Sequence, residues 1–298
     1  MCFKKKILLL GGSSYVGQNI LKAYGADWIA ATYHSQPIPN GIFYDALSME
    51  LTDVINNPAE FSHALILLGD TKPGSCARDP RKSHQLNVVR IERLIDQLNN
   101  FGIKPVFFSS EYVFDGQKGD YTEWDEPKPI LLYGKQKLEV EKYIKSKSRD
   151  YLIVRLAKTY GSTPGDNTLL TNWLEVVCGI NNIKCAADQI FSPIYINDVV
   201  AGVRAMLVND LYGVYHLSCG VAYKRIDILQ MLIRTISNTL KLDIQITPCS
   251  INDFGLNEAM PINVSMNSNK LSKVIAMKYH KIDLICKTMV ENWLNAKR

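Results

Sequence analysis

The sequence predicts an α/β fold, with a doubly wound parallel sheet followed by a smaller C-terminal α/β domain. Through the first two thirds of the 298 residues, apolar runs of strand length alternate with stretches of helical period. A glycine-rich turn directly follows the first apolar run. After Gly161 the pattern changes to helices and short strands, and single hydrophobic cores stop growing at about 250–300 residues. We therefore expect a large domain at 1–163, with a returning segment at about 194–220, and a smaller domain at 164–193 and 221–298.

Each expected element follows from its hydrophobic pattern. Short, nearly continuous apolar runs predict buried strands at residues 7–10, 28–32, 42–44, 64–68, 105–109 and 152–156. Apolar side chains at helical spacing predict a helix at 87–98, closed by Gly102, and another at about 135–145. After Gly161 the patterns predict helices at 169–177, 198–208, 226–240 and 284–294, with strands at 214–217 and 244–247.

Composition and charge argue against several classes of protein. The 34 basic and 29 acidic side chains give a net charge of +5 that is spread thinly, so nucleic acid is not a favoured partner. The apolar run at 7–10 ends at Gly11, which is too short for a signal peptide or a membrane span. Seven scattered cysteines, with no C-x-x-C pair and no histidine at ligand spacing, indicate reduced thiols in a cytoplasm and no metal site.

The turn at residues 11–17 is a candidate phosphate site. It follows a strand and opens a helix, so its amide groups and the helix dipole would favour a pyrophosphate. Gly11 would make the tight turn and Gly17 would let the helix approach the strand. Ser14 replaces the middle glycine of G-x-x-G-x-x-G and adds a Cβ where the backbone comes closest to phosphate. Strand, glycine turn and helix in this order are typical of a Rossmann-type dinucleotide-binding domain.

The choice of dinucleotide depends on the end of the second strand. An acidic residue there would hold the 2′-hydroxyl of NAD, but the sequence has Thr-Tyr-His-Ser at 32–35. The missing acid favours NADP, although His34 is a weak substitute for arginine, and NAD stays open. Asp45, followed by Ala46, could present a carboxylate to the adenine edge.

Three further residues suggest acid–base chemistry. Tyr133 and Lys137 lie four apart on an expected helix, so they share a face. A phenol has a pKa of about 10, so its use near neutrality requires a nearby cation, and Lys137 is placed to lower the pKa of Tyr133. Ser110 follows a strand end where parallel sheets bind ligands, and it would hydrogen-bond a substrate oxygen. Tyr-x-x-x-Lys alone is common on solvated helices, but the order of turn, serine and tyrosine favours an active site.

These motifs resemble the extended short-chain dehydrogenase/reductase family. The segment F-S-S-E-Y-V-F-D-G at 108–116 is similar to S-T-D-Y-V-F-D-G of the dTDP-4-dehydrorhamnose reductase branch. P-I-L-L-Y-G-K-Q-K at 129–137 is similar to its P-x-x-x-Y-G-x-x-K, and R-L-A-K-T-Y-G at 155–161 also aligns. The similarity runs from residue 5 to about 208.

The resemblance implies a catalytic triad of Ser110, Tyr133 and Lys137, with Asn87 as the helix asparagine that supports it. A buried helix-capping asparagine is an equal alternative for Asn87. The expected cofactor-binding residues are Gly11, Ser13, Ser14, Tyr15, Val16, Gly17, His34, Asp45, Ala46, Gly69, Asn87, Ser109, Tyr133 and Lys137. The expected substrate-binding residues are Glu111, Tyr112, Lys158 and Asn167.

The expected function is the reduction, with NADP or NAD as cofactor, of a nucleotide-linked keto-sugar, most simply a 4-keto-6-deoxyhexose. Lys158 stands where the reductases carry a tryptophan, and Phe191 and Met260 also depart from the family pattern, so the sugar itself stays open. A non-catalytic NADP-binding subunit, like the β subunit of methionine adenosyltransferase, is one alternative. A nucleotide-sugar epimerase or dehydratase is another. No membrane partner is expected, and a homodimer stays open.

Overall fold

The computed structural model describes residues 5–25, 27–177, 179–240 and 243–296, and its contacts divide the chain into two compact units. Unit 1 comprises Met1–Phe114, Glu126–Leu156 and Val200–Tyr215, and unit 2 comprises Asp115–Asp125, Ala157–Val199 and His216–Arg298. Cys2 and Cys178 lie outside the described residues, and the other five cysteines form no disulfide bond.

A seven-stranded sheet forms the centre of unit 1. Its order is β11-β6-β5-β4-β1-β2-β3, and the pairs from β6 to β3 are all parallel. From β1 the chain first adds β2 and β3 on one side and then adds β4, β5 and β6 on the other side. Open α/β sheets bind ligands at this switch point, between β1 and β4. The strands are β1 Lys6–Leu10, β2 Ile29–Tyr33, β3 Ile42–Phe43, β4 Phe61–Ile66, β5 Lys104–Ser110, β6 Leu152–Leu156 and β11 Gly213–Leu217.

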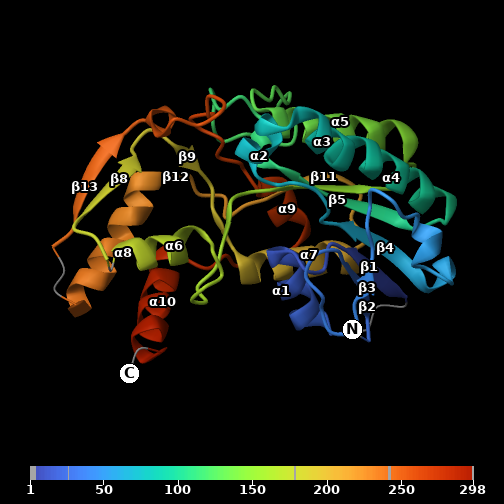
Figure 1. Ribbon diagram of the computed structural model, residues 1–298, viewed down its shortest axis with the longest axis horizontal. Coiled ribbons are helices and arrows are strands. Elements are labelled where there is room, and N and C mark those ends of the chain that lie inside the picture. Colours follow the sequence, from blue (N-terminus) through green and yellow to red (C-terminus); the bar gives the residue numbers. More distant parts are fainter. Residues whose placement is uncertain (1–4, 26, 178, 241–242, 297–298) are drawn as a thin grey trace. The chain divides into compact units, whose positions relative to one another are not determined.

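Helices cover both faces of this sheet. Helices α3 Pro80–His84, α4 Arg90–Asn100 and α5 Leu132–Lys147 lie on one face, and α1 Tyr15–Tyr24 and α7 Ile196–Val208 lie on the other (Figure 1). Helix α2 Pro73–Arg78 precedes α3, and a π-helical turn, Gln85–Val89, joins α3 to α4. Short 3₁₀ turns occur at Leu51–Asp53, Pro58–Glu60 and Glu111–Val113. The expected doubly wound parallel sheet is confirmed.

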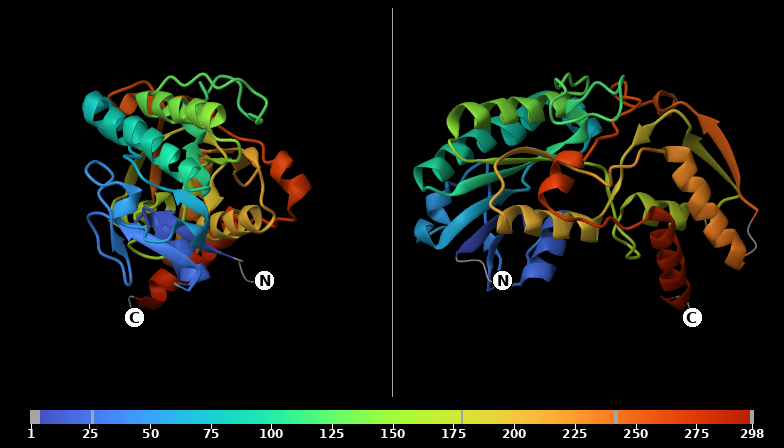
Figure 2. Two further views of the ribbon diagram at one scale, coloured as in Figure 1. Left: turned by 90° about the vertical axis from the view of Figure 1, so that its right-hand side faces the viewer. Right: turned by 180° about the vertical axis from the view of Figure 1, so that it is seen from behind.

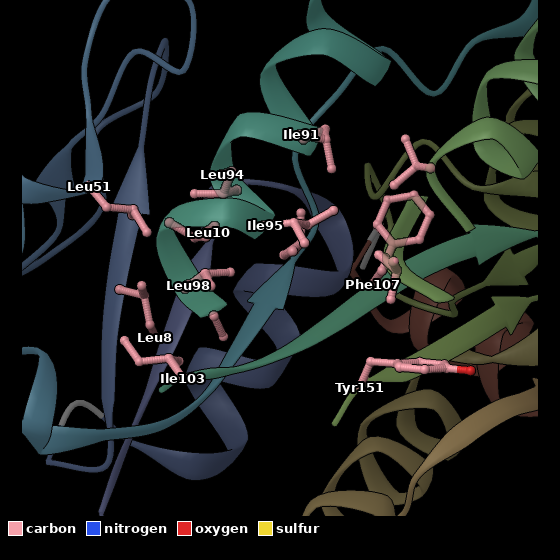
Figure 3. Packing of buried hydrophobic residues seen from close by; sticks show 14 of the residues in the cluster. Leu8, Leu10, Leu51, Ile91, Leu94, Ile95, Leu98, Ile103, Phe107 and Tyr151 are labelled. Atoms are coloured by element: carbon pink, nitrogen blue, oxygen red, sulfur yellow. The ribbon is translucent and has the colours of Figure 1, made fainter. Parts of the chain in front are cut away.

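The main core of unit 1 lies between α4, α5 and the sheet. The strands present side chains such as Leu8, Leu10 and Phe107, all fully buried. Helix α4 places its four buried apolar side chains over them (Figure 3), namely Ile91, Leu94, Ile95 and Leu98. Their spacing is that of one face of a helix, and burying each such side chain stabilises the fold by about 1.5–3 kcal/mol.

Unit 2 is built from helices and three two-stranded sheets (Figure 2). β7 Thr159–Tyr160 pairs with β10 Ile194–Tyr195, β9 Ile190–Phe191 with β12 Tyr223–Lys224, and β8 Asn182–Ala186 with β13 Gln245–Cys249. Its other elements are α6 Leu169–Val177, α8 Arg225–Leu240, α9 Asn269–Val274, α10 Ile282–Ala296 and a 3₁₀ turn at Ile251–Phe254.

The expected elements are present, with shifted ends. The helix expected at 135–145 begins at Leu132 and ends at Lys147, so Tyr133 lies in its first turn. The helix expected at 87–98 starts within the π-helical turn Gln85–Val89, and α4 follows it from Arg90 to Asn100. Helices α2, α3 and α9, strand β8 and the two-residue strands of unit 2 were not expected. In the described part of the chain, no helix has the length and apolar character needed to cross a bilayer.

Candidate active site

The glycine-rich turn at residues 11–17 joins β1 to α1 and has the geometry that its sequence predicts. Gly11 adopts φ +93°, a conformation that L side chains rarely adopt, and its amide donates to Thr32 Oγ1 at 3.1 Å. A Cβ on Gly17 would lie 2.5 Å from the carbonyl oxygen of Gly11, so only glycine allows the helix to approach this closely. Gly11 and Gly17 therefore have the roles expected of them.

Ser14 occupies the position of the missing glycine as the N-cap of α1. Its φ of −66° is ordinary for any residue, and its side-chain oxygen accepts from the Gly17 amide at 3.1 Å. The turn therefore keeps its shape with a side chain at this position. Ser13 precedes the cap, and Tyr15 and Val16 are the first two residues of α1, where backbone amide groups favour an anion.

The ends of β2 and β3 carry the residues expected near an adenosine. His34 and Phe43 stack with ring centroids 6.1 Å apart, and His34 Nε2 lies 3.9 Å from Asp45 Oδ1. The carboxylate of Asp45 accepts from Ser48 Oγ and from the Leu47 amide, and these hydrogen bonds lower the pKa of Asp45. Asp45 thus closes its own turn, and Ala46 lies within that turn.

Ser110, Tyr133 and Lys137 come together at the carboxyl end of β5. The Ser110 and Tyr133 side chains are hydrogen-bonded, and the Lys137 Nζ lies 5.7 Å from the centre of the Tyr133 ring. Lys137 Nζ donates to the carbonyl oxygen of Phe108 at 2.9 Å. All three side chains are buried. The arrangement can hold a carbonyl oxygen between two hydroxyl groups, beside a cation.

The protonation of Tyr133 differs from the sequence-based expectation. Burial raises the pKa of Tyr133 well above its usual range, and the Ser110 hydrogen bond opposes this increase only in part. The expectation that Lys137 lowers this pKa is wrong for the structure, because loss of solvent around the phenol dominates. Tyr133 is therefore a neutral phenol near pH 7, in the state required of a proton donor.

Burial has the opposite effect on the lysine. It lowers the pKa of Lys137 to about 8, because the charged ammonium loses its solvent, while Cys76 and Glu141 oppose the decrease. Lys137 thus titrates close to physiological pH.

Close packing places the tyrosine against the 3₁₀ turn that follows β5. A Cβ on Gly134 would lie 1.9 Å from the carbonyl oxygen of Tyr112, so the glycine lets α5 contact this turn. The rings of Tyr112 and Tyr133 meet edge to face, with centroids 6.4 Å apart. The amide of Tyr112 donates to Ser110 Oγ at 3.2 Å. Glu111, in the same turn, is buried.

A buried ion pair lies beneath the serine pair at the end of β5. Glu141 accepts from Arg155 Nε at 3.0 Å and from its terminal nitrogen at 2.8 Å. The hydroxyl of Ser109 donates to the same carboxylate at 2.6 Å. Ser109, expected to bind the cofactor, thus uses its side chain to join β5 to α5.

Asn87 and Gln136 form a second buried link. Asn87 Nδ2 donates to Gln136 Oε1 at 2.8 Å, and Gln136 Nε2 donates to Ser83 Oγ at 2.9 Å. Asn87 Oδ1 also accepts from the Asp70 amide at 2.7 Å, directly after Gly69. Asn87 therefore links the loop after β4 to the helix of Tyr133, an arrangement that fits both roles expected of it.

Two of the expected substrate residues belong to unit 2. Lys158 and Asn167 are exposed, and Asn167 has φ 56°. The other expected site residues belong to unit 1. Among the residues that the structure describes, no group of three or more histidine, cysteine and acidic side chains is arranged to hold a metal ion.

Sequence reasoning missed Ser83, Thr32 and the role of Gln136. Gln136 is three residues after Tyr133, a spacing that places the two side chains near one another on a helix, and this signal could have identified it.

The sheet order, the phosphate turn and the Ser-Tyr-Lys cluster define the class of short-chain dehydrogenases/reductases, which carry this site on a Rossmann-type sheet. Within it, the chain belongs to the family of the RmlD substrate-binding domain, whose family model matches residues 5–294.

The chain is similar to relatives that carry two different names. The dTDP-4-dehydrorhamnose reductase of Sinorhizobium fredii is 30% identical over 148 residues, which are 47% of this chain and 49% of the relative. Methionine adenosyltransferase 2 subunit beta of Rattus norvegicus is 35% identical over 157 residues, 50% of this chain and 47% of the relative. In both alignments the chain spans about half the length of the relative.

The fold is also that of solved reductases. The crystal structure of dTDP-4-dehydrorhamnose reductase from Bacillus anthracis in complex with NADP has a TM-score of 0.78 with 19% identity, covering 97% of this chain and all of that one.

Proposed function

We propose that the protein is an NAD(P)H-dependent reductase of a nucleotide-linked keto-sugar, with a 4-keto-6-deoxyhexose as the expected sugar. The cluster of Ser110, Tyr133 and Lys137 at the carboxyl edge of the sheet carries this proposal. Family membership and the reductase relative support it. We further propose that unit 1 binds the cofactor and that unit 2, with Lys158 and Asn167, binds the sugar nucleotide.

The residues of unit 1 fit a dinucleotide. The turn from Gly11 to Gly17 offers a helix amino end to the pyrophosphate, and no side chain fills the position of Gly11. The residues at the end of β2, Thr-Tyr-His-Ser at 32–35, include no acid to hold a 2′-hydroxyl, which favours NADP over NAD. The Asp45 carboxylate, 3.9 Å from His34 Nε2, follows β3 instead. When bound, the dinucleotide would supply the hydride for the reduction.

The side chains of the cluster would manage the proton and the developing charge. Ser110 donates a hydrogen bond to the substrate carbonyl oxygen and orients it. Tyr133, kept neutral by burial, donates its phenolic proton to the same oxygen as negative charge develops there. Lys137, charged below pH 8, stabilises the tyrosinate that remains.

Replacement of Tyr133 by phenylalanine tests this mechanism. We expect turnover to fall by about 10²–10⁴-fold, the usual contribution of general acid catalysis, with NADPH affinity within a factor of two of wild type. The assay follows nicotinamide absorbance while dTDP-, UDP-, GDP- and CDP-linked keto-sugars are added. Tyr143→Phe is the matched control, because Tyr143 lies on the same helix and donates to Asp96 at the surface. Unchanged turnover in Tyr133→Phe would refute the assigned role.

A second candidate is a non-catalytic NADP-binding subunit, favoured by the 35% identity to the methionine adenosyltransferase subunit. Tight NADPH binding, no turnover of any keto-sugar and co-purification with a synthetase would support it. Oxidation of NADPH by one sugar would exclude it as the sole function. A cytoplasmic location stays a prediction from the sequence.

A further inference from the structure

Gln136 lies between the two catalytic residues of α5 but faces a different set of partners. Its side chain is 1% exposed, and both ends of its amide are hydrogen-bonded to buried groups. A buried amide with both ends paired has one defined orientation, since rotating it would leave a donor opposite a donor. Gln136 therefore ties α5 to α3, through Ser83, and to the π-helical turn, through Asn87.

Its main partner, Asn87, lies in the π-helical turn before α4. Such turns insert one residue into a helix and re-aim the side chains around it, and they are frequent at functional sites. Here the turn directs the Asn87 amide toward two elements at once. Nδ2 donates to Gln136 Oε1 at 2.8 Å and to the Asp70 carbonyl oxygen at 3.0 Å, while Oδ1 accepts from the Asp70 amide at 2.7 Å.

Asp70 and Gly69 follow β4, which is one of the two strands at the switch point of the sheet. Ligands of open α/β sheets cross the carboxyl edge at this point. A series of hydrogen bonds thus connects the loop at the cofactor edge to the helix that carries Tyr133 and Lys137. It runs from Asp70 through Asn87 to Gln136.

We infer that Gln136 is a positioning residue, which holds the proton-donating helix in register with the cofactor-side loop through Asn87. This inference rests on the proposed reductase function. Hydride transfer is sensitive to small displacements, because misplacement by about 1 Å can cost 10²-fold in rate. The contribution of Gln136 should therefore appear in turnover more than in binding.

The test uses Gln136→Leu, which keeps the approximate size of the side chain and removes both hydrogen bonds. We expect kcat to fall at least tenfold, NADPH affinity to stay within threefold, and the deuterium isotope effect with NADPH labelled at the transferred position to increase. Ser83→Ala removes the other partner of Gln136 but keeps its bond to Asn87, and should retain kcat within threefold. Gln136→Glu keeps an oxygen for Asn87 and should recover part of the lost rate.

A second measurement does not depend on turnover. The Asp70 amide donates to Asn87, so hydrogen exchange at Asp70 should become at least tenfold faster in Gln136→Leu and stay unchanged in Gln97→Leu, a matched substitution on α4. If Gln136→Leu does not fold, Gln136→Ala takes its place in both measurements.

Unchanged exchange at Asp70 would overturn the link, and unchanged kcat and isotope effect in an active enzyme would overturn the positioning role. Additive losses of kcat in Asn87→Ala, Gln136→Ala and the double variant would also refute coupling through this contact. Failure of the wild-type protein to reduce any sugar would instead refute the proposed function, and the exchange measurement would still decide the link.

Discussion

The lowered pKa of Lys137 predicts how turnover depends on pH. Burial lowers this pKa to about 8, from an ordinary value of 10.5. A lysine with a lowered pKa is charged below it and loses the charge as pH rises through it. Tyr133, in contrast, keeps its proton across this range because burial raises its pKa. The lysine alone should therefore govern the alkaline limb of the activity profile.

The size of the effect follows from the titration curve. With a pKa of about 8, roughly nine in ten lysines are charged at pH 7 and roughly one in ten at pH 9. If the reaction requires the charged form, kcat/KM for the keto-sugar should fall nearly tenfold between pH 7 and pH 9. The assay is initial-rate oxidation of NADPH from pH 6 to pH 10 in buffers of constant ionic strength.

Lys137→Arg is the control, because an arginine keeps its charge throughout this range. Its absolute rate should be lower, since guanidinium geometry differs, but its alkaline fall should disappear. A wild-type profile that stays flat to pH 10, or an arginine variant with the same alkaline fall, would refute the role of the lysine charge. The pH dependence of stability is an independent check. Between pH 8 and 10.5 the lysine binds more protons in the unfolded state than in the folded state. Its contribution to the free energy of unfolding should therefore rise with pH over that interval.

Three further predictions concern the architecture of the site. Glu141→Gln should lower the free energy of unfolding by about 3–5 kcal/mol in urea titrations, because Arg155 is 1% exposed and its charge would be left unpaired. A loss below about 1 kcal/mol would contradict this reasoning. Gly134→Ala should abolish most turnover, since its Cβ would meet the Tyr112 carbonyl at 1.9 Å, and a fully active variant would show that α5 can shift at no cost. Gly11→Ala should weaken NADPH binding at least tenfold by fluorescence titration, because φ +93° strains an alanine; unchanged affinity would exclude the turn as the binding site.

Much of unit 1 could be predicted because its strands are buried on both faces and therefore read as apolar runs. Helices α2 and α3 could not, since each has five or six residues, begins at a proline and shows too few turns to reveal a period. The two-residue strands of unit 2 carry too little pattern to distinguish them from loops.

The site divides in the same way. The approach of Tyr133 to Lys137 follows from their spacing on one helix, and the place of Ser110 follows from the carboxyl end of its strand. The direction of the Tyr133 pKa could not be predicted, because it depends on how completely Tyr112 and the adjoining turn exclude solvent. The link from Asn87 to Gln136 joins residues 49 apart in sequence, so it required the packing of α4 and the π-helical turn against α5.

The serine cap at the start of α1 bears on how such turns diversify. The middle position of the turn has extended backbone and an inward-facing hydroxyl, so its requirement is for a capping oxygen and not for the absence of a side chain. A sequence search that requires glycine at position 14 would reject this chain, although glycine is present at positions 11 and 17, where the structure has no room for a side chain or strains one. Threonine and asparagine meet the same requirement, while aspartate would set a negative charge against the pyrophosphate. Variation at this position should therefore be bounded by electrostatics, and variation at Gly11 and Gly17 by geometry.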